Sequence, residues 1–327
     1  MFLRFKIYLC VIAMAIPLIP TLLYSQNNKS SSNEQIKIRF SPQWTPQSQF
    51  AGYYAAKELG FYDEAGLDVE IIHPSSSVGA LPLLKDKQSD IIGLDLIAAI
   101  YENMNGESLC NILQSSQTSS LVIISHNPIS KIKDLSGKKI GRWNVGFSLV
   151  PLSATHDLNT QVEWINIWGG VNFFLSKAVD ANLMMTYNEL LNVKHTGYEI
   201  NPNQLIYFRD FEQYNIPEDG IYTTSEFAKS YPHAVDGFRE ASIKGWLWVR
   251  ENQEEALDMV MKMIQNENIP SNRVHQKMML EEILTLQLNK SGERSMVLDQ
   301  SDFERAKKLL IKNNVNANLV NYESFVK

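Results

Sequence analysis

The sequence has very little cysteine and no cysteine framework. Only Cys10 and Cys110 are present among 327 residues. Cys10 lies in an apolar N-terminal run that we expect to be removed, which would leave Cys110 alone in the mature chain. A disulfide or a cysteine metal site within one mature chain is therefore excluded. Cys110 falls on the apolar side of a predicted strand, and we interpret it as a buried, inert thiol.

Clusters of basic or catalytic residues are also missing. The net charge is −6 and no tract is rich in lysine or arginine, so the electrostatic footprint of a nucleic-acid partner is absent. The six histidines are scattered without metal-binding spacing, and neither a GxSxG elbow nor a P-loop occurs. A Ser/His/Asp triad has no fixed spacing, but nothing points to one. We therefore predict a protein that is not an enzyme and that uses no metal or cofactor.

The N-terminal segment has the layout of a secretory signal. A short basic start precedes an apolar run over residues 7–23, and a small residue follows at Ser25. We predict a signal peptide over residues 1–25, a polar tether over 26–35 and a mature protein in the periplasm. An uncleaved membrane anchor is the alternative, because the run is nearly long enough to span a bilayer. Two prolines inside the run disfavour a continuous helix.

The rest of the chain alternates short apolar strands with helical stretches. A composition of 44% hydrophobic and 20% charged residues is that of a globular protein. Alternating strands and helices indicate βαβ units and a mostly parallel sheet. A second set of strands is expected after the apolar strand at residues 121–125. We predict two α/β lobes around a ligand cleft, the first lobe over 36–125, the second over 126–217, and a return to the first over 218–327.

Helical periodicity predicts individual elements within these lobes. Expected helices include residues 78–84, 171–178 and 189–195, and nearly everything after Ser225 is expected to be helical. A helix that begins near Phe50 is expected to end at Gly60 in the left-handed conformation.

An unusual group of aromatic and amide side chains follows the first predicted strand. The group comprises Trp44, Gln47, Gln49, Phe50 and Tyr53. Ligands in open α/β sheets bind beyond the carboxyl ends of strands, which is where this group lies. Aromatic faces can stack on a flat ligand, and glutamines both donate and accept hydrogen bonds. Ordinary core packing is the alternative for each aromatic taken alone.

Two glycine-containing segments also follow predicted strands. In GRWNVGFS, Gly146 and the free amides of a helix start could hold an anion or a carboxylate. In IWGGV, Gly169 beside Trp168 lets the backbone approach a ligand. The glycine pattern alone is a weak signal.

A third segment, MTYNE, places Tyr187, Asn188 and Glu189 at the end of another strand. A carboxylate on the wall of a cleft suits a ring amine or a cation. A solvated glutamate at a helix start is the alternative, since the helix dipole also favours it there.

Several motifs together resemble one family of solute-binding proteins. They are W-x-P at Trp44–Pro46, AGYYAAKELGFYDEAGLDVEI, DLSGKKIG, VDA before MTYNE, and TTSEFAKSYPHAVDGFREASIKGW. The chain is similar from about Ile36 to Lys327 to the family that joins alkanesulfonate-binding proteins, thiamine-pyrimidine-precursor binders and the yeast pyrimidine-precursor synthase. The resemblance implies a type II periplasmic-binding-protein fold that holds a small ligand between its lobes for an ABC permease. Similar domains fused to sensor kinases make a sensing role the alternative.

The chain departs from the family at informative positions. The pyrimidine-binding pattern W-x-P-N-x-x-H-x-G has Gln47 in place of asparagine and Phe50 in place of histidine. The lysine and histidine of the synthase match Asp95 and Ala99, so we reject the synthase activity, which needs the amine. The phosphate-holding loop is kept only in part, over Asn144, Val145, Gly146 and Phe147, so a phosphorylated ligand is not expected.

We therefore predict a monomeric binding protein for a thiamine-related aminopyrimidine or a similar flat heterocycle. Trp44 and Phe50 are expected to stack on the ring. Its polar edge is expected to contact Gln47, Asn188 and Glu189. The remaining predicted ligand-binding residues are Gln49, Tyr53, Asp95, Asn144, Gly146, Phe147, Trp168, Gly169 and Tyr187.

Overall fold

The computed structural model describes residues 35–75, 78–289, 291–292 and 295–327. The predicted signal peptide and all of the predicted tether except Gln35 lie outside the described residues. No helix within these ranges combines the length and apolar character needed to cross a membrane.

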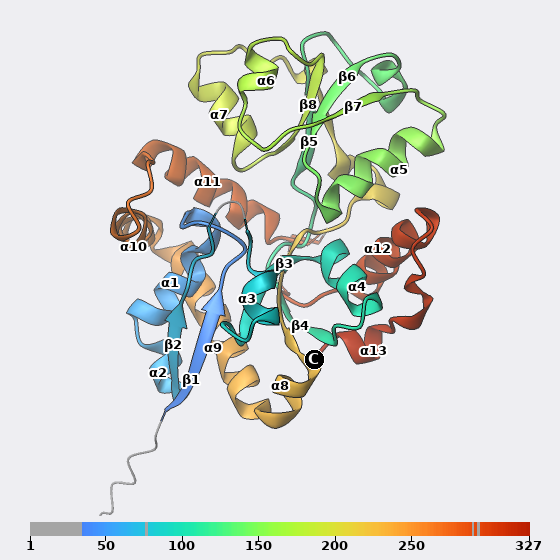
Figure 1. Cartoon of the computed structure of the whole chain (residues 1–327). Helices are drawn as coiled ribbons and strands as arrows, with labels where there is room; N and C mark the ends of the chain where they lie inside the picture. The colour runs from blue at the N-terminus through green and yellow to red at the C-terminus, as the bar shows by residue number, and fades with distance from the viewer. Residues whose placement is uncertain (1–34, 76–77, 290, 293–294) are drawn as a thin grey trace, which may run out of the picture. The chain divides into compact units, whose positions relative to one another are not determined.

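Two five-stranded sheets form the framework (Figure 1). The first sheet has the order β2-β1-β3-β10-β4 and the second has the order β7-β6-β8-β5-β9. The strands are β1 Ile36–Ser41, β2 Leu67–Ile71, β3 Ile91–Asp95, β4 Leu109–Gln114, β5 Leu121–Ser125, β6 Lys139–Arg142, β7 Glu163–Asn166, β8 Ala181–Met185, β9 Leu205–Tyr207 and β10 Asp219–Thr224.

In each sheet one strand runs against the other four. β10 pairs antiparallel with β3 and β4, and β5 pairs antiparallel with β8 and β9. These are the two strands with which the chain crosses from one sheet into the other. The expectation that the second sheet starts after residues 121–125 is therefore wrong. β5 is fully buried between two strands of that sheet, so the first crossing lies before Leu121.

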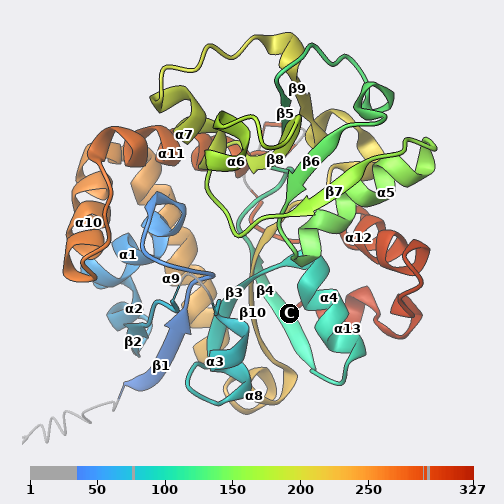
Figure 2. The same cartoon turned by 45° about the horizontal axis from the view of Figure 1, so that its top comes forward.

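Helices pack against both sheets, and the late helices return to the first one. Helices α9 and α10 contact α1, so the C-terminal part of the chain covers the first strands (Figure 2). The α-helices are α1 Ala51–Glu58, α2 Phe61–Glu64, α3 Leu81–Lys85, α4 Leu96–Met104, α5 Leu149–Asp157, α6 Asn172–Leu175, α7 Glu189–His195, α8 Ser225–Ser230, α9 Pro232–Glu251, α10 Gln253–Asn266, α11 Arg273–Leu286, α12 Gln300–Lys312 and α13 Tyr322–Phe325. Short 3₁₀ helices are η1 Ser48–Phe50, η2 Ile132–Leu135, η3 Gly146–Ser148, η4 Pro202–Gln204, η5 Phe208–Asp210, η6 Glu212–Tyr214 and η7 Ala317–Leu319.

Most predicted helices occur, with some differences in length. α7 has the predicted bounds, and Gly60 takes a φ of 76° directly after α1, as predicted. α3 and α6 are shorter than predicted. Gly79 and Lys177 have φ values of 72° and 60°, and this left-handed backbone limits the start of α3 and the end of α6.

Two glycines allow α1 and α9 to approach each other closely. A Cβ atom on Gly52 would overlap the ring of Trp246, and a Cβ atom on Gly245 would overlap the Gly52 carbonyl oxygen. Both glycines belong to motifs on which the family resemblance depends. Their role in this fold is to bring the backbones of two helices into contact.

Cys110 is a free, buried cysteine in β4, as predicted. Burial raises the pKa of its thiol to about 11, with small opposing effects from nearby lysines. At neutral pH it is therefore an unreactive thiol.

Candidate functional site

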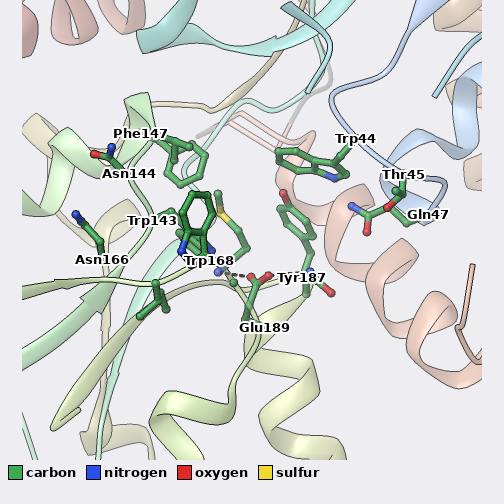
Figure 3. A pocket seen from close by; sticks show the side chains of 15 residues that line it. Trp44, Thr45, Gln47, Trp143, Asn144, Phe147, Asn166, Trp168, Tyr187 and Glu189 are labelled. Carbon is green, nitrogen blue, oxygen red and sulfur yellow. Dashed lines mark hydrogen bonds between the residues drawn. The ribbon is translucent and has the colours of Figure 1, made fainter. Parts of the chain in front are cut away.

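A cavity of ≈ 550 Å³ lies between loops that follow strands of the two sheets (Figure 3). One loop follows β1 and the others follow β6, β7 and β8. All four leave the carboxyl ends of strands, the position at which α/β sheets bind ligands. The cavity is lined by Trp44, Thr45, Gln47, Trp143, Asn144, Val145, Phe147, Asn166, Ile167, Trp168, Gly169, Met185, Tyr187, Asn188 and Glu189.

Aromatic side chains dominate the wall. Figure 3 shows Trp44 on one side and Trp143, Phe147 and Trp168 on the other, with Tyr187 between them. Trp143 and Phe147 meet edge to face, with ring centroids 5.6 Å apart. Trp168 is 102% exposed, so its ring packs against nothing and stands at the rim. The wall therefore offers several flat apolar faces to a ligand.

A chain of hydrogen bonds holds Trp44 from behind. The indole Nε1 of Trp44 donates to Gln49 Oε1 at 2.9 Å, and Gln47 Nε2 donates to the same oxygen at 2.6 Å. Gln49 Nε2 in turn donates to Asp219 Oδ2 at 2.8 Å. Gln49 thus connects the cavity wall to a half-buried carboxylate of β10 and fixes the orientation of the indole.

Glu189 begins α7 at the floor of the cavity. Its carboxylate accepts hydrogen bonds from the Met185 amide at 3.1 Å and from Asn188 Nδ2 at 2.8 Å. Burial raises the pKa of Glu189, and these hydrogen bonds oppose that rise. The backbone amide of Glu189 also contributes. A carboxylate has about four acceptor positions, so some acceptor capacity is left.

Asn188 also connects the two lobes. Its Oδ1 lies 3.1 Å from Nε2 of His275, which is on α11 in the part of the chain that returns to the first sheet. The His275 ring meets the ring of His195 edge to face at 5.4 Å. The cavity is therefore bordered by a direct contact between helices of the two lobes.

Three further carboxylates lie close together where β10 begins beside the end of β3. Asp95 and Glu218 are buried, and Asp219 is half-buried. Burial raises the pKa of Asp95 to about 7, that of Glu218 to about 8 and that of Asp219 to about 6. Asp219 raises the pKa of both neighbours further, because like charges repel. Glu218 accepts hydrogen bonds from Ser119 and Ser120 and so ties the two crossing segments together.

We expect Glu218 to make the folded protein less stable as the pH rises. Its pKa of about 8 in the folded state lies above that of an exposed glutamate, so the folded state binds the proton more tightly. This stabilisation is complete below about pH 4.3, the unfolded pKa, and is lost as the pH rises to about 8. Urea unfolding at pH 5, 7 and 9 should show a loss of stability in the wild type that is smaller in Glu218→Gln by on the order of 3 kcal/mol, while Asp95 and Asp219 contribute to the loss in both proteins.

The matched control is Glu226→Gln, which changes an exposed carboxylate on α8. It should keep the wild-type pH profile. A Glu218→Gln profile parallel to that of the wild type would show that Glu218 does not titrate in this range.

The structure brings together nine of the residues predicted from the sequence. Those that line the cavity are Trp44, Gln47, Asn144, Phe147, Trp168, Gly169, Tyr187, Asn188 and Glu189. Whether a ligand touches each of them stays a prediction.

Three predicted residues after β1 lie behind the wall. Gln49 is buried and supports Trp44. Phe50 is only 4% exposed and packs with its ring centroid 5.8 Å from that of His73. Tyr53 lies in the core against Phe40 and Trp246. The expected stacking by Phe50 is therefore corrected: the aromatic rings that share the cavity with Trp44 come from the second lobe.

Asp95 and Gly146 also lie outside the cavity wall, for a shared reason. Asp95 caps α4, with its Oδ1 accepting from the Ala98 amide at 2.9 Å. A Cβ atom on Gly146 would lie 2.9 Å from that Asp95 oxygen and 3.0 Å from the Ala98 nitrogen. Gly146 thus packs directly against the start of α4. It is in contact with Asp95, and this contact keeps both residues out of the cavity wall.

The sequence prediction missed six lining residues. They are Thr45, Trp143, Val145, Asn166, Ile167 and Met185. Each is within two positions of a predicted residue, either in the same loop or, for Asn166 and Met185, at the end of the strand before it. Including the whole loop and the last residue of the strand would have found them. Trp143 carried the clearest signal, as an aromatic directly after a strand in GRWNVGFS.

Charge is almost absent from the lining. It contains no lysine, arginine, histidine or cysteine, and Glu189 is its one carboxylate. Within the described ranges, no group of histidine, cysteine, aspartate or glutamate side chains has the arrangement of a metal site. The arrangement can stack on a ring, exchange hydrogen bonds with its edge and attract positive charge.

Comparisons with known proteins agree on a family and a fold. The family model described as "NMT1/THI5 like" matches residues 47–256. The formylaminopyrimidine-binding protein of Halalkalibacterium halodurans is 24% identical over 272 residues, covering 75% of this chain and 76% of that protein. A putative thiamine biosynthesis protein of Haemophilus influenzae is 27% identical over 204 residues, covering 58% of this chain and 60% of that protein.

Solved structures show the same architecture at low sequence identity. A protein from Bordetella bronchiseptica has a TM-score of 0.67 at 16% identity, covering 90% of this chain and 95% of that chain. The periplasmic aliphatic sulphonate binding protein SsuA from Escherichia coli has a TM-score of 0.65 at 12% identity, covering 89% and 98%. A Candida albicans protein described as having the generic periplasmic binding protein fold has a TM-score of 0.60 at 17% identity, covering 90% and 96%. The sequence resemblance is confirmed: the chain belongs to the NMT1/THI5-like family and has the two-lobe α/β periplasmic-binding-protein fold.

Proposed function

We propose that this protein is an extracytoplasmic solute-binding protein that captures a small flat heterocycle between its lobes and delivers it to an ABC importer. The observation that carries the proposal is the aromatic cavity between the two lobes, at the carboxyl ends of four strands. A relative with 24% identity is named for binding formylaminopyrimidine, which supports a substituted pyrimidine as the first candidate.

The size and polarity of the cavity support a small heterocyclic ligand. A volume of ≈ 550 Å³ lies within the usual range for small-molecule pockets, roughly 300–1,000 Å³. Indole and phenol faces can cover a ring, and the side chains of Gln47, Asn188 and Glu189 offer donors and acceptors to ring nitrogens and amino groups.

The lack of a cation in the lining argues against an anionic ligand. A sulfonate, phosphate or carboxylate would lose its hydration without gaining a positive partner, and the nearby Glu189 would repel it. The lining also lacks the amine that a covalent carbonyl cofactor needs, so we propose binding and release without turnover.

A thermal-shift screen tests this proposal. We expect 4-amino-5-hydroxymethyl-2-methylpyrimidine or a close analogue to stabilise the protein by roughly 2.7 kcal/mol at about 100 times its Kd. Alkanesulfonates such as taurine should leave the melting temperature unchanged. Stabilisation by sulfonates but by no heterocycle would overturn the proposal.

Uptake measurements separate import from sensing. Deleting the gene should abolish uptake of the labelled ligand at low concentration if the protein serves an importer. Unchanged uptake together with a changed response of a membrane kinase would assign the cavity to sensing instead.

A further inference from the structure

Among the described residues, the cavity wall carries one negative charge and no positive one. Glu189 is 9% exposed and keeps acceptor capacity toward the cavity after bonding Met185 and Asn188. Side chains that could neutralise it are missing from the lining. An unpaired carboxylate in a buried apolar wall is costly unless something positive joins it.

A further carboxylate lies behind the wall. Asp219 has a pKa of about 6 and is mostly ionised at pH 7, whereas Glu218, with a pKa of about 8, is mostly protonated there. Within the described ranges, Asp219 forms no ion pair with a lysine, arginine or histidine. Tyr187, on the wall, is within electrostatic reach of Glu189, Glu218 and Asp219 at once. The charges of Glu189 and Asp219 therefore favour positive charge in the cavity.

A polar atom at the same place is also left without a partner. Tyr187 is 2% exposed and lines the cavity. Its hydroxyl lies near Gln49 but has no hydrogen-bonding partner of acceptable geometry among the described residues. The hydroxyl oxygen is itself buried, so a ligand in the cavity contacts the ring of Tyr187 and not its hydroxyl.

We infer that the ligand is a flat organic cation, whose positive group lies against Glu189 and the faces of Trp44, Trp143 and Tyr187. The inference rests on the proposed binding function of this cavity and specifies the class of molecule. Aromatic faces attract cations through their negative quadrupole, and more strongly when water is excluded. A carboxylate combined with aromatic faces can therefore prefer a cation over a neutral molecule of the same shape. An alkylammonium group on a ring and a ring with quaternary nitrogen are the two chemical forms that fit.

Pairs of ligands that differ in one charge test the inference. 4-Amino-5-aminomethyl-2-methylpyrimidine carries a protonated amine at neutral pH, and its N-formyl derivative has the same ring without the charge. N-Methylquinolinium and quinoline form a second pair with a fixed charge. Titration calorimetry of the full mature protein at pH 7 gives the affinity ratio of cation to neutral molecule in each pair. We expect at least a tenfold preference for the cation in one pair or both.

Glu189→Gln tests the residue assigned to the charge. It keeps the size and one acceptor oxygen and removes the negative charge, so the cation-to-neutral ratio should fall toward one. A general loss of folding would lower both affinities together and leave their ratio unchanged. Glu226→Gln, outside the cavity, should keep the wild-type ratio.

The possible outcomes distinguish the cation inference from the proposed binding function. A cation preference that disappears in Glu189→Gln supports the inference. Neutral members that bind as tightly as the cations overturn it and leave the proposed binding function in place. A cation preference that survives Glu189→Gln refutes the role given to Glu189. If no member of either pair binds, the cation inference and the heterocycle proposal both fail.

Discussion

Gly245→Ala is expected to lower the free energy of unfolding by about 3 kcal/mol. The new methyl group would overlap the Gly52 carbonyl oxygen, and the Ala56 nitrogen and Cβ are each only 2.9 Å from its position. Backbone atoms cannot move aside as a flexible side chain can, so α1 and α9 must separate. Overpacking of this kind typically costs about 1–3 kcal/mol and occasionally more.

Gly237→Ala in the same helix is the matched control. Its Cβ would come no closer than 3.3 Å to a neighbour, the Cβ of Ala65. Alanine favours a helix over glycine by up to about 1 kcal/mol, so this variant should be neutral or slightly stabilised. Urea unfolding of both variants measures the difference. Equal stabilities would mean that α1 and α9 do not meet as closely as the structure places them.

Trp44→Ala is expected to weaken ligand binding on the order of 100-fold. The indole is held by Gln49 and presents its face to the cavity, and removing a stacked aromatic typically costs about 1–3 kcal/mol per ring. Trp44→Phe keeps an aromatic face and loses the indole donor, so it should retain most of the affinity. Calorimetry with the heterocycle found by the thermal-shift screen provides the measurement.

Trp168 provides the comparison from the other side of the cavity. Its ring is fully exposed at the rim, so Trp168→Ala should reduce the affinity by less than about threefold if the ligand is held deeper in the cavity. Trp44→Ala with unchanged affinity would remove Trp44 from the binding site. A large loss in Trp168→Ala would show that its loop folds over the ligand.

Two contacts between the lobes lie beside the cavity. His275 meets Asn188 on one side of the cavity, and Gly146 packs on the start of α4 on another. Both contacts join the two lobes directly. A hinge motion that separated the lobes would have to break both contacts.

Periodicity in the sequence was enough to predict most of the elements and the loops that line the cavity. The βαβ alternation predicted strands and helices because local apolar spacing reflects which face is buried. The loops after β1, β6, β7 and β8 were predicted as binding loops because ligand sites follow the carboxyl ends of strands, a rule that needs no coordinates. The family motifs then predicted the two-lobe fold.

The direction of each strand, and whether a side chain faces the cavity or the core, depended on the tertiary structure. β5 and β10 run against their neighbours because the chain enters each sheet from the other, and apolar composition carries no sign of direction. Trp44 and Phe50 are both aromatic and six positions apart, but one lines the cavity and the other is core. Phe50 and Gln49 belong to the η1 turn, which directs both side chains toward the core. There Gln49 donates a hydrogen bond to Asp219, which comes from a strand distant in the sequence.

The charges around the cavity also depended partly on the local sequence and partly on the tertiary structure. Tyr187 and Glu189 were predicted as site residues from their place after a strand. Their surroundings include Glu218 and Asp219, which come from the second crossing between the sheets. Desolvation and electrostatic coupling depend on which residues pack together in space, and a sequence does not state this. The local sequence therefore determined which residues were candidates for the site, and the packing of the two sheets decided which of them line the cavity and which carboxylates lie near it.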